Sequence, residues 1–297
     1  MRISRELWSK VLLLYQEFKR RGEPLGRPRL MKMLGISENY ARAILFALEN
    51  RDIIRLEPLN FTPVKTELVI ADIHIPFHDP LAVESALFYA ERQGVDLIVI
   101  LGDLVDFYKI STFLKNPSKK SVGEEIKQAK DFLKDLRQRF KNAKIIYKEG
   151  NHEFRLQRYL MKNAPEIYNL VDNLLQVSLE LKDLNIEYVI EPFRVGKLWH
   201  LHGHERPGGS YNPEYITNVM WKYIHDHFIV GHYHRTQEKV YKRIDGKNYW
   251  GGAVGYLAKN LEYATLNNWT QGFAIIRYAE DGTFRAELRR IVNGDIF

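Results

Sequence analysis

The stretch Leu97-Ile-Val-Ile-Leu-Gly-Asp-Leu-Val-Asp106 places five consecutive apolar residues directly before a glycine and two aspartates. A short apolar run of this kind, closed by glycine, predicts a strand. Similar runs occur at Leu68–Ala71 and Lys144–Tyr147, and helical spacing predicts helices over about residues 80–93 and 122–140. This alternation predicts an α/β fold in which crossover helices connect the strands of a sheet.

Polar side chains follow five of the predicted strands. Asp72 and His74 follow the first strand, and Asp103 and Asp106 follow the second. Because the carboxyl ends of strands in an open α/β sheet converge on one crevice, we expect these groups to meet in space. We interpret Asp-x-His as two side chains on an extended segment, where residues i and i+2 point the same way. The other clusters are Gly150-Asn151-His152-Glu153, His202-Gly203-His204 and Gly231-His232-Tyr233-His234.

The clusters together offer carboxylates, imidazoles and one amide, and the chain has no cysteine. Mixed nitrogen and oxygen ligands of this type suit divalent Mn, Fe, Zn, Ni or Co, and a carboxylate can bridge two ions. Two ions ~3.5–4 Å apart generate hydroxide and neutralise charge on a phosphoryl group during in-line displacement. The residues therefore predict a site for divalent metal ions.

The motifs, in this order, resemble those of the calcineurin-like metallophosphoesterase superfamily over roughly residues 66–290. The resemblance implies a metallophosphoesterase β-sandwich flanked by helices, with two divalent metals at the strand ends, for which we expect Mn²⁺ with Fe, Zn, Ni or Co as alternatives. It also implies a phosphoesterase with a bridging hydroxide as nucleophile, in which His152, oriented by Asp106, protonates the leaving oxygen or stabilises the transition state. By the same resemblance Asp72, His74 and His234 hold one metal, Asn151, His202 and His232 hold the other, and Asp103 bridges them.

Further polar residues near these motifs are candidates for substrate binding. We expect Arg155 and Arg206 to bind a phosphate and His204 to contact it. Glu153 has two interpretations, a carboxylate that supports the ligands or simply the start of the next helix. A lysine-rich loop at residues 109–120 either binds a nucleic-acid backbone or is ordinary solvated surface.

The N-terminal segment has a different character from the rest of the chain. Residues 1–60 contain twelve Lys and Arg against seven Asp and Glu, which accounts for +5 of the net charge of +7. A basic segment favours a polyanionic partner, most often nucleic acid. We therefore expect two domains, a small all-α domain at 1–60 and a calcineurin-like metallophosphoesterase domain at 66–297.

Within the first domain, amphipathic patterns predict helices at residues 5–20, 28–34 and 38–50, and Ile53–Leu56 predicts a small wing strand. Two helices joined by a tight turn containing glycine form a helix-turn-helix pattern. We expect the third helix to enter a nucleic-acid groove, while the alternative is a domain that docks a protein or mediates assembly. The side chains expected to contact nucleic acid are Asn39, Tyr40 and Arg42.

Composition narrows the class of protein. The chain has 297 residues, 45% of them hydrophobic and 27% charged, which excludes disordered, collagen-like and coiled-coil architectures. Its apolar runs are far shorter than the ~20 residues of a membrane helix, and its N-terminus lacks the apolar core of a signal peptide. We therefore expect a cytoplasmic protein with no membrane partner.

Three functions are compatible with these observations. The first is a metal-dependent nuclease, or an end-processing phosphodiesterase or phosphatase acting on nucleic acid. The second is a phosphomonoesterase or phosphodiesterase of small nucleotides or phosphoproteins, whose N-terminal domain serves assembly. The third is a DNA-binding regulator with a degenerate enzyme domain, which is disfavoured because every expected ligand is present. Oligomeric state is left open by the sequence.

Overall fold

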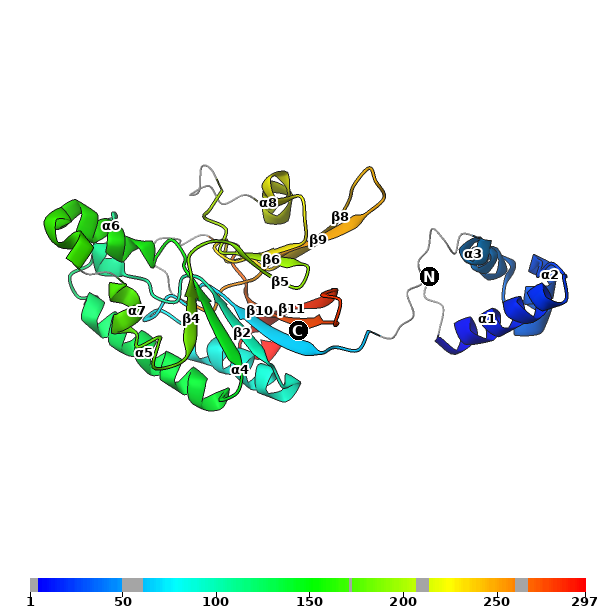
Figure 1. Ribbon diagram of the computed structural model, residues 1–297, viewed down its shortest axis with the longest axis horizontal. Coiled ribbons are helices and arrows are strands. Elements are labelled where there is room, and N and C mark those ends of the chain that lie inside the picture. Colours follow the sequence, from blue (N-terminus) through cyan, green and yellow to red (C-terminus); the bar gives the residue numbers. More distant parts are fainter. Residues whose placement is uncertain (1–4, 50–60, 171–172, 207–213, 260–266) are drawn as a thin grey trace. The chain divides into compact units, whose positions relative to one another are not determined.

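The computed structural model describes residues 5–49, 61–170, 173–206, 214–259 and 267–297. The chain divides into two compact units, residues 1–61 and residues 62–297, which are described separately below (Figure 1). No helix among the described residues has the length and apolar character needed to cross a membrane.

The described residues of unit 1 form three helices, α1 (Arg5–Arg20), α2 (Arg27–Leu34) and α3 (Glu38–Glu49). Gly35 ends α2 in a left-handed conformation, with φ 63°. The Ser37 hydroxyl then accepts a hydrogen bond from the Tyr40 amide at 3.4 Å and so caps α3. The wing strand predicted at 53–56 lies outside the described residues. The buried core of the unit consists of Val11, Phe18, Leu25, Leu30, Ala41, Ile44 and Leu48.

Unit 2 is built on a seven-stranded sheet with the order β12-β11-β10-β1-β2-β3-β4. Strands β1 to β4 run parallel, so their carboxyl ends lie at the same edge, while β10 pairs with β1 in the antiparallel sense. The bounds are β1 (Lys65–Ile70), β2 (Leu97–Leu101), β3 (Lys144–Lys148), β4 (Ile186–Val189), β10 (Gln271–Tyr278), β11 (Phe284–Val292) and β12 (Asp295–Ile296).

One face of this sheet packs against helices, and the other packs against the second sheet. On β1, Leu68 and Ile70 pack in a core with α4 (Pro80–Gln93) and α5 (Val122–Arg139), whose members include Ala86 and Leu133. The side chain of Val69, which lies between Leu68 and Ile70 on the strand, points to the other face of the sheet. It packs in a core that includes Leu198 and Ile229 of the second sheet. Successive side chains on a strand point to opposite faces, which is why a continuous apolar strand can fill both cores.

The second sheet has the order β5-β6-β7-β9-β8 and lies on the face of the first sheet opposite α4 and α5 (Figure 1). Strands β6, β7 and β9 are parallel. Its outer face is covered by α8 (Ile216–Ile224), whose Ile216 and Met220 pack on Phe228 and Val230. The bounds are β5 (Phe193–Val195), β6 (Leu198–Leu201), β7 (Phe228–Val230), β8 (Gln237–Lys242) and β9 (Asn248–Ala253).

These observations confirm the predicted fold class, an α/β sandwich of two sheets flanked by helices. As the β-sandwich implied by the family resemblance requires, β1, β2 and β3 belong to the first sheet and β6 and β7 to the second. The five strand ends therefore do not converge at the edge of one open sheet, contrary to the expectation from the sequence. The remaining elements of unit 2 are η1 (Tyr108–Ile110), α6 (Phe154–Asn163), η2 (Pro165–Leu170) and α7 (Leu174–Ser178).

Candidate metal centre

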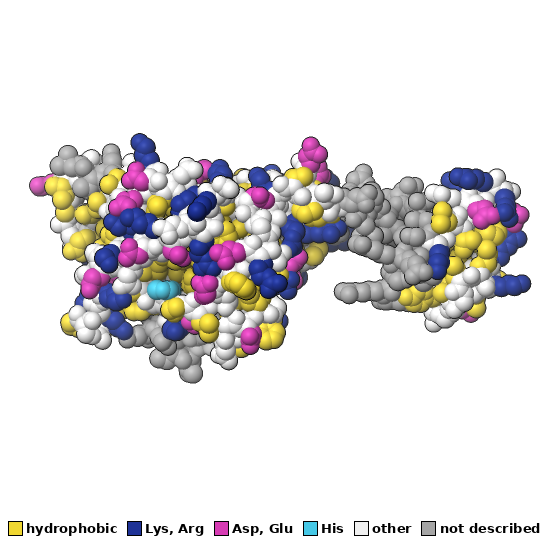
Figure 2. All heavy atoms as spheres, turned by 90° about the horizontal axis from the view of Figure 1, so that it is seen from below, with side chains coloured by type: hydrophobic (Ala, Val, Ile, Leu, Met, Phe, Trp, Pro, Cys, Tyr) yellow, Lys and Arg dark blue, Asp and Glu magenta, His cyan; other side chains and the backbone are white. Residues whose placement is uncertain are grey.

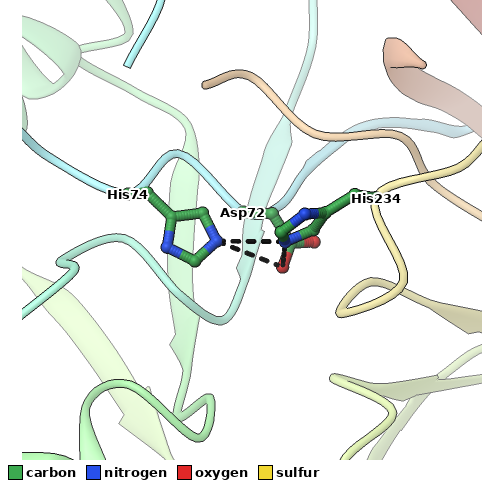
Figure 3. A group of neighbouring side chains, drawn as sticks. All are labelled: Asp72, His74 and His234. Atoms are coloured by element: carbon green, nitrogen blue, oxygen red, sulfur yellow. Dashed lines mark hydrogen bonds and ion pairs between the residues drawn. The ribbon is translucent and has the colours of Figure 1, made fainter. Parts of the chain in front are cut away.

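Three of the expected ligands, Asp72, His74 and His234, form one buried group at the ends of β1 and β7 (Figure 3). The Nε2 atoms of His74 and His234 are 3.1 Å apart. Asp72 Oδ1 lies 3.3 Å from His234 Nε2 and 3.9 Å from His74 Nε2. This oxygen is buried and accepts no hydrogen bond in the described part of the chain. Because a buried carboxylate oxygen without a donor is costly, a cation between these three atoms fits the group.

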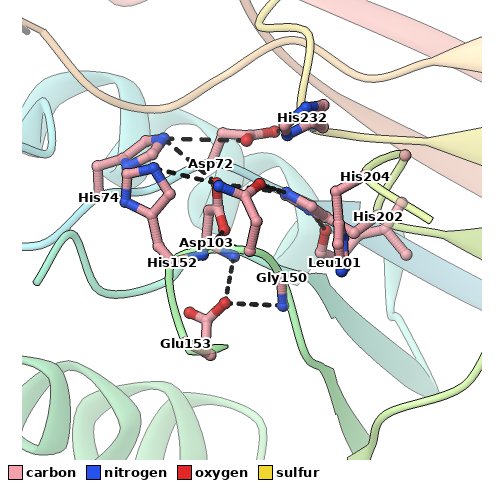
Figure 4. A network of polar contacts seen from close by, with 12 residues as sticks. Asp72, His74, Leu101, Asp103, Gly150, His152, Glu153, His202, His204 and His232 are labelled. Carbon is pink, nitrogen blue, oxygen red and sulfur yellow. Dashed lines mark hydrogen bonds and ion pairs between the residues drawn. The ribbon is translucent and has the colours of Figure 1, made fainter. Parts of the chain in front are cut away.

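A second group lies at the ends of β2, β3 and β6. His202 Nε2 is 3.3 Å from Asp103 Oδ2 and 3.2 Å from the Asn151 side-chain oxygen. His232 completes a set of ligand atoms with Asp103 and His202. Asp103 Oδ2 is also 3.9 Å from His74 Nε2, so Asp103 lies between the two groups (Figure 4). Asp103 shares one set of ligand atoms with His202 and His232 and another with His74 and His152, which fits the bridging arrangement implied by the sequence motifs.

The backbone at these residues is unusual. Asp72, His74, Asp103, His232 and His234 all adopt positive φ, between 51° and 67°. Non-glycine residues rarely occupy this left-handed region. The interpretation of Asp-x-His as an extended segment is therefore wrong. The chain instead turns sharply after each strand, and His232 joins the second group while His234 joins the first.

Two glycines allow the ligands to approach the backbone closely. A Cβ atom added to Gly150 would lie 2.3 Å from Asp103 Oδ1, and one added to Gly102 would lie 2.3 Å from His202 Nδ1. Any side chain at either position would displace a ligand. These glycines are therefore required for the geometry of the second group.

The charges in the centre favour an ionised bridging carboxylate. Burial opposes ionisation of Asp103, but neighbouring His152, His202 and His74 hold the pKa of its carboxyl well below the usual value. Burial likewise opposes protonation of His202, yet Asp103 raises the pKa of His202 to about 10. Asp72 has a lowered pKa as well, because His234 outweighs the cost of burial. The carboxylates are thus available as metal ligands at neutral pH.

His152 is held by hydrogen bonds at both ring nitrogens. Its Nδ1 donates to the Asp106 backbone oxygen at 2.8 Å, and Nε2 accepts from Arg155 Nη2 at 2.8 Å. Burial lowers the pKa of His152 to about 3, so its resting form is neutral. The Asp106 carboxylate lies closer to His74 Nδ1, at 3.1 Å, than to His152 Nδ1, at 3.5 Å. Asp106 therefore contacts His152 more closely through its backbone oxygen than through its carboxylate.

Glu153 fits both interpretations left open above, because it lies at the start of α6 and also supports the centre. Its carboxylate accepts hydrogen bonds from the amides of Asp103, Leu104 and Gly150, at 3.0, 2.9 and 2.7 Å. The Tyr147 hydroxyl donates to it at 2.7 Å. Glu153 thus connects the turn after β2, which carries Asp103, to the turn after β3.

Glu205, which was not among the residues predicted from the sequence, plays a similar part for the turn that carries His202. Its carboxylate accepts hydrogen bonds from the amides of His202 and Gly203, at 3.0 and 2.6 Å. Lys148, which is fully buried, places its ammonium 3.1 Å from the same carboxylate. Although burial alone would raise it, Lys148 lowers the pKa of Glu205 to about 2. Lys148, a charged residue at the end of the apolar run of β3, was the feature of the sequence that could have indicated this ion pair.

The residues expected to bind substrate lie on two sides of the centre. Arg155 donates to the Asp106 backbone oxygen at 2.8 Å, next to His152. Arg206 Nε donates to the Tyr233 hydroxyl at 2.8 Å, and that hydroxyl donates to the Gly203 oxygen at 2.9 Å. His204 has its ring centroid 5.3 Å from that of His202. Tyr233 is buried and lies between His232 and His234 in the sequence. It holds Arg206 in place through the hydrogen bond at its hydroxyl, a role that was not predicted from the sequence.

The candidate nucleic-acid residues lie in unit 1. Asn39 and Arg42 are exposed, and Tyr40 is half-buried. The carboxylate of Glu38 lies 3.2 Å from both Arg42 and Arg27, so part of the positive charge on α3 is neutralised locally. Figure 2 shows Lys and Arg side chains around the rim of this unit, with a few acidic side chains among them.

Two packed sheets, with a buried set of carboxylates, imidazoles and one amide at their strand ends, define the class of a metal-dependent hydrolase. The sequence profile of the calcineurin-like phosphoesterase family matches residues 67–264. The chain belongs to this family, whose members typically bind two divalent metals and hydrolyse phosphate esters.

The chain is also similar to individual proteins. The chain is 30% identical over 250 residues to the Gene 54 protein of Mycobacterium phage L5, covering 77% of this chain and 95% of the relative. Among solved structures it is similar to a dimetal phosphatase from Danio rerio, with 13% identity, a TM-score of 0.38 and coverage of 80% and 98%. It is also similar to the phosphoesterase Yfce from E. coli, with 15% identity, a TM-score of 0.34 and coverage of 75% and 98%.

Proposed function

We propose that the protein is a phosphoesterase of nucleic acid, a nuclease or an end-processing enzyme, that uses two divalent ions, preferably Mn²⁺. The observation that supports a two-metal site is the position of Asp103 between two ligand groups. Asp72, His74 and His234 would hold one ion, and Asn151, His202 and His232 the other. Bound divalent ions supply Lewis acidity toward a phosphoryl oxygen and lower the pKa of water.

The residues around the ligands have separate parts in this proposal. His152 and Arg155 form a hydrogen-bonded pair beside Asp103, and His152 Nε2 lies 3.7 Å from Asp103 Oδ2. We assign to this pair the contact with the leaving oxygen, with the Arg155 guanidinium donating hydrogen bonds to the phosphate. Asp106 positions both members, since its backbone oxygen accepts a bond from each. His204 and Arg206 would contact the same phosphate from the opposite side.

Unit 1 supports a polynucleotide substrate. It carries +5 of the net charge of +7, and Asn39, Tyr40 and Arg42 would contact the nucleic acid through α3. The alternative, a small-substrate esterase whose unit 1 serves assembly, is favoured by the local pairing of Arg27 and Arg42 with Glu38.

A denaturing gel of end-labelled DNA and RNA oligonucleotides, incubated with protein and Mn²⁺, separates the two functions. The strands would carry 3′-hydroxyl, 3′-phosphate or 2′,3′-cyclic phosphate ends, with bis-p-nitrophenyl phosphate as the activity control and a chelator as the blank. We expect shortened or end-shifted strands that depend on the metal. Intact strands beside an active control would contradict a nucleic-acid substrate and support the small-substrate alternative.

A further inference from the structure

An aromatic rim borders the first ligand group, and neither the ligand set nor the phosphate contacts use it. We define this rim as Tyr256 and Trp269, whose rings contact His234, together with Phe77, whose backbone amide donates to the His74 backbone oxygen at 2.6 Å. The Tyr256 ring stacks on His234 at an interplanar angle of 13° and a centroid distance of 5.2 Å. Trp269 meets the same imidazole edge-on, with centroids 4.4 Å apart. All three rim residues are half-buried, so each keeps part of its surface toward solvent.

The segments that carry the rim are tied to each other and to the ligands. Phe77 lies three residues after His74, and its backbone oxygen accepts a hydrogen bond from the Lys259 amide at 2.9 Å. The Thr270 amide donates to the His234 backbone oxygen at 2.8 Å, which fixes the residue next to Trp269. These hydrogen bonds therefore fix the position of the rim relative to the candidate metal centre.

Cations accompany the aromatic rings. Lys119 Nζ lies over the Phe77 ring, 5.4 Å from its centroid. Lys259 adds a second ammonium, which lies 3.4 Å from Asp79 and is half exposed. Aromatic faces with interleaved lysines are the combination by which proteins bind unpaired nucleotides, since bases stack on the rings and phosphates pair with the cations.

We propose that the aromatic rim binds an unpaired nucleobase adjoining the scissile phosphate, which makes the substrate a single-stranded or frayed end of nucleic acid. This inference rests on the proposed function. A nucleotide carries its base one sugar away from its phosphate, so a phosphate at the ligand groups brings the base to the rings that border His234. Trp269 has the largest ring of the three and is the main stacking surface.

The test uses the full-length protein with Mn²⁺ and two single-stranded oligonucleotides of the same sequence. One is intact, and the other has abasic residues on both sides of the cleaved bond, mapped beforehand. The quantity measured is the ratio of kcat/KM on the intact strand to kcat/KM on the abasic strand. We expect a ratio of about ten for wild type, from the usual strength of base stacking, and a ratio near one for Trp269→Ala.

Two further variants distinguish stacking of a base on Trp269 from support of His234 by the same ring. Trp269→Phe should restore most of the preference, since it keeps an aromatic face. Phe88→Ala, at an exposed ring on α4, should keep the wild-type ratio. If Trp269 only supported His234, then Trp269→Ala would lower both rates equally and leave the ratio unchanged, which would overturn the inference. Equal cleavage of both strands by wild type would overturn it too, while the proposed function would stand. Cleavage of neither strand would overturn both.

Discussion

At the scale of single residues, the left-handed backbone of the ligand residues is held in place by its surroundings. Such conformations cost about 1–3 kcal/mol each and persist only where neighbouring bonds fix them. The Asp72 amide donates to the Gly102 oxygen at 3.1 Å, and the His74 amide donates to the Asp103 oxygen at 2.9 Å. The Leu257 amide donates to the Asp72 oxygen at 3.1 Å. The turns after β1 and β2 therefore lock each other, and strained positions locked this way are typical of functional sites.

The roles of Asp103 and His152 can be separated by substitution. We expect His152→Ala to lower kcat by about 10²–10⁴-fold, because a group near the leaving oxygen is lost, while the metal content stays near that of wild type. Asp103→Asn should lower metal content and activity together, because the bridging carboxylate is removed. Metal analysis by mass spectrometry and hydrolysis of bis-p-nitrophenyl phosphate give the two readouts.

A matched histidine control is His225→Asn, at the left-handed cap of α8, where asparagine tolerates the φ of 52°. It should leave both readouts near wild type. If His152→Ala also lost metal, His152 would be a ligand and the assignment above would be wrong.

The sequence predicted candidate ligands that would lie close together, but not all their contacts. Asp72 groups with His74 and His234, and Asp103 groups with His202 and His232. The hydrogen bond from His74 to the Asp106 carboxylate depends on two left-handed turns, and strand periodicity contains no information about them. The position of Trp269 against His234 was equally unpredictable, because it follows from the pairing of segments that are distant in sequence.

At the scale of elements, α5 supports the turn after β2. Glu125 on α5 accepts a hydrogen bond from the Tyr108 amide at 3.3 Å and another from the Phe107 amide. Burial, together with the Asp106 carboxylate, raises the pKa of Glu125 to about 8. This carboxyl is therefore protonated near neutral pH. It stabilises the turn because its oxygens accept the hydrogen bonds from the Phe107 and Tyr108 amides.

The raised pKa of Glu125 predicts a pH-dependent stability. An unfolded chain releases this proton at the ordinary pKa of 4.5, whereas the folded chain keeps it up to about 8. Stability should therefore fall as the pH rises through this window. We expect Glu125→Gln to gain about 3 kcal/mol relative to wild type between pH 5 and pH 8, measured by urea unfolding at each pH.

The neighbouring Glu124 provides the control. It is exposed, and its hydrogen bonds with Ser121 lower its pKa, so it stays ionised throughout the window. Glu124→Gln should show no difference between the two pH values. An equal response of both variants would mean that Glu125 does not carry the pH dependence.

Elements with a strong periodic pattern were predictable, and some short ones were not. Leu97–Leu101 is β2 with the predicted bounds, and the helix predicted over 80–93 is α4. Strand β5 has only three residues, too few to show a period, whereas the equally short β7 coincides with the strand predicted before Gly231 and His232. Apolar runs alone did not divide the strands between two sheets, because a run buried on both faces looks the same whether its second partner is a helix or a sheet. The sandwich was expected only from the family resemblance.

At the scale of the whole molecule, the candidate site depends on the packing of one sheet on the other. The first sheet supplies Asp72, Asp103 and Asn151, while the second supplies His202 and His234. Each of the two groups described above takes ligands from both sheets, although His74, Asp103 and His152 of the first sheet also form a set by themselves. Folding of unit 2 and assembly of the metal centre are therefore coupled, and bound metal should stabilise the folded chain.

The most direct test of this account is a metal titration of chelator-treated protein, with bound metal and bis-p-nitrophenyl phosphate hydrolysis measured on the same samples. The account predicts that activity is absent without metal and reaches its plateau at about two Mn²⁺ per chain. Activity that persists without metal, or a plateau at a single bound ion, would contradict the two-metal centre built around Asp103.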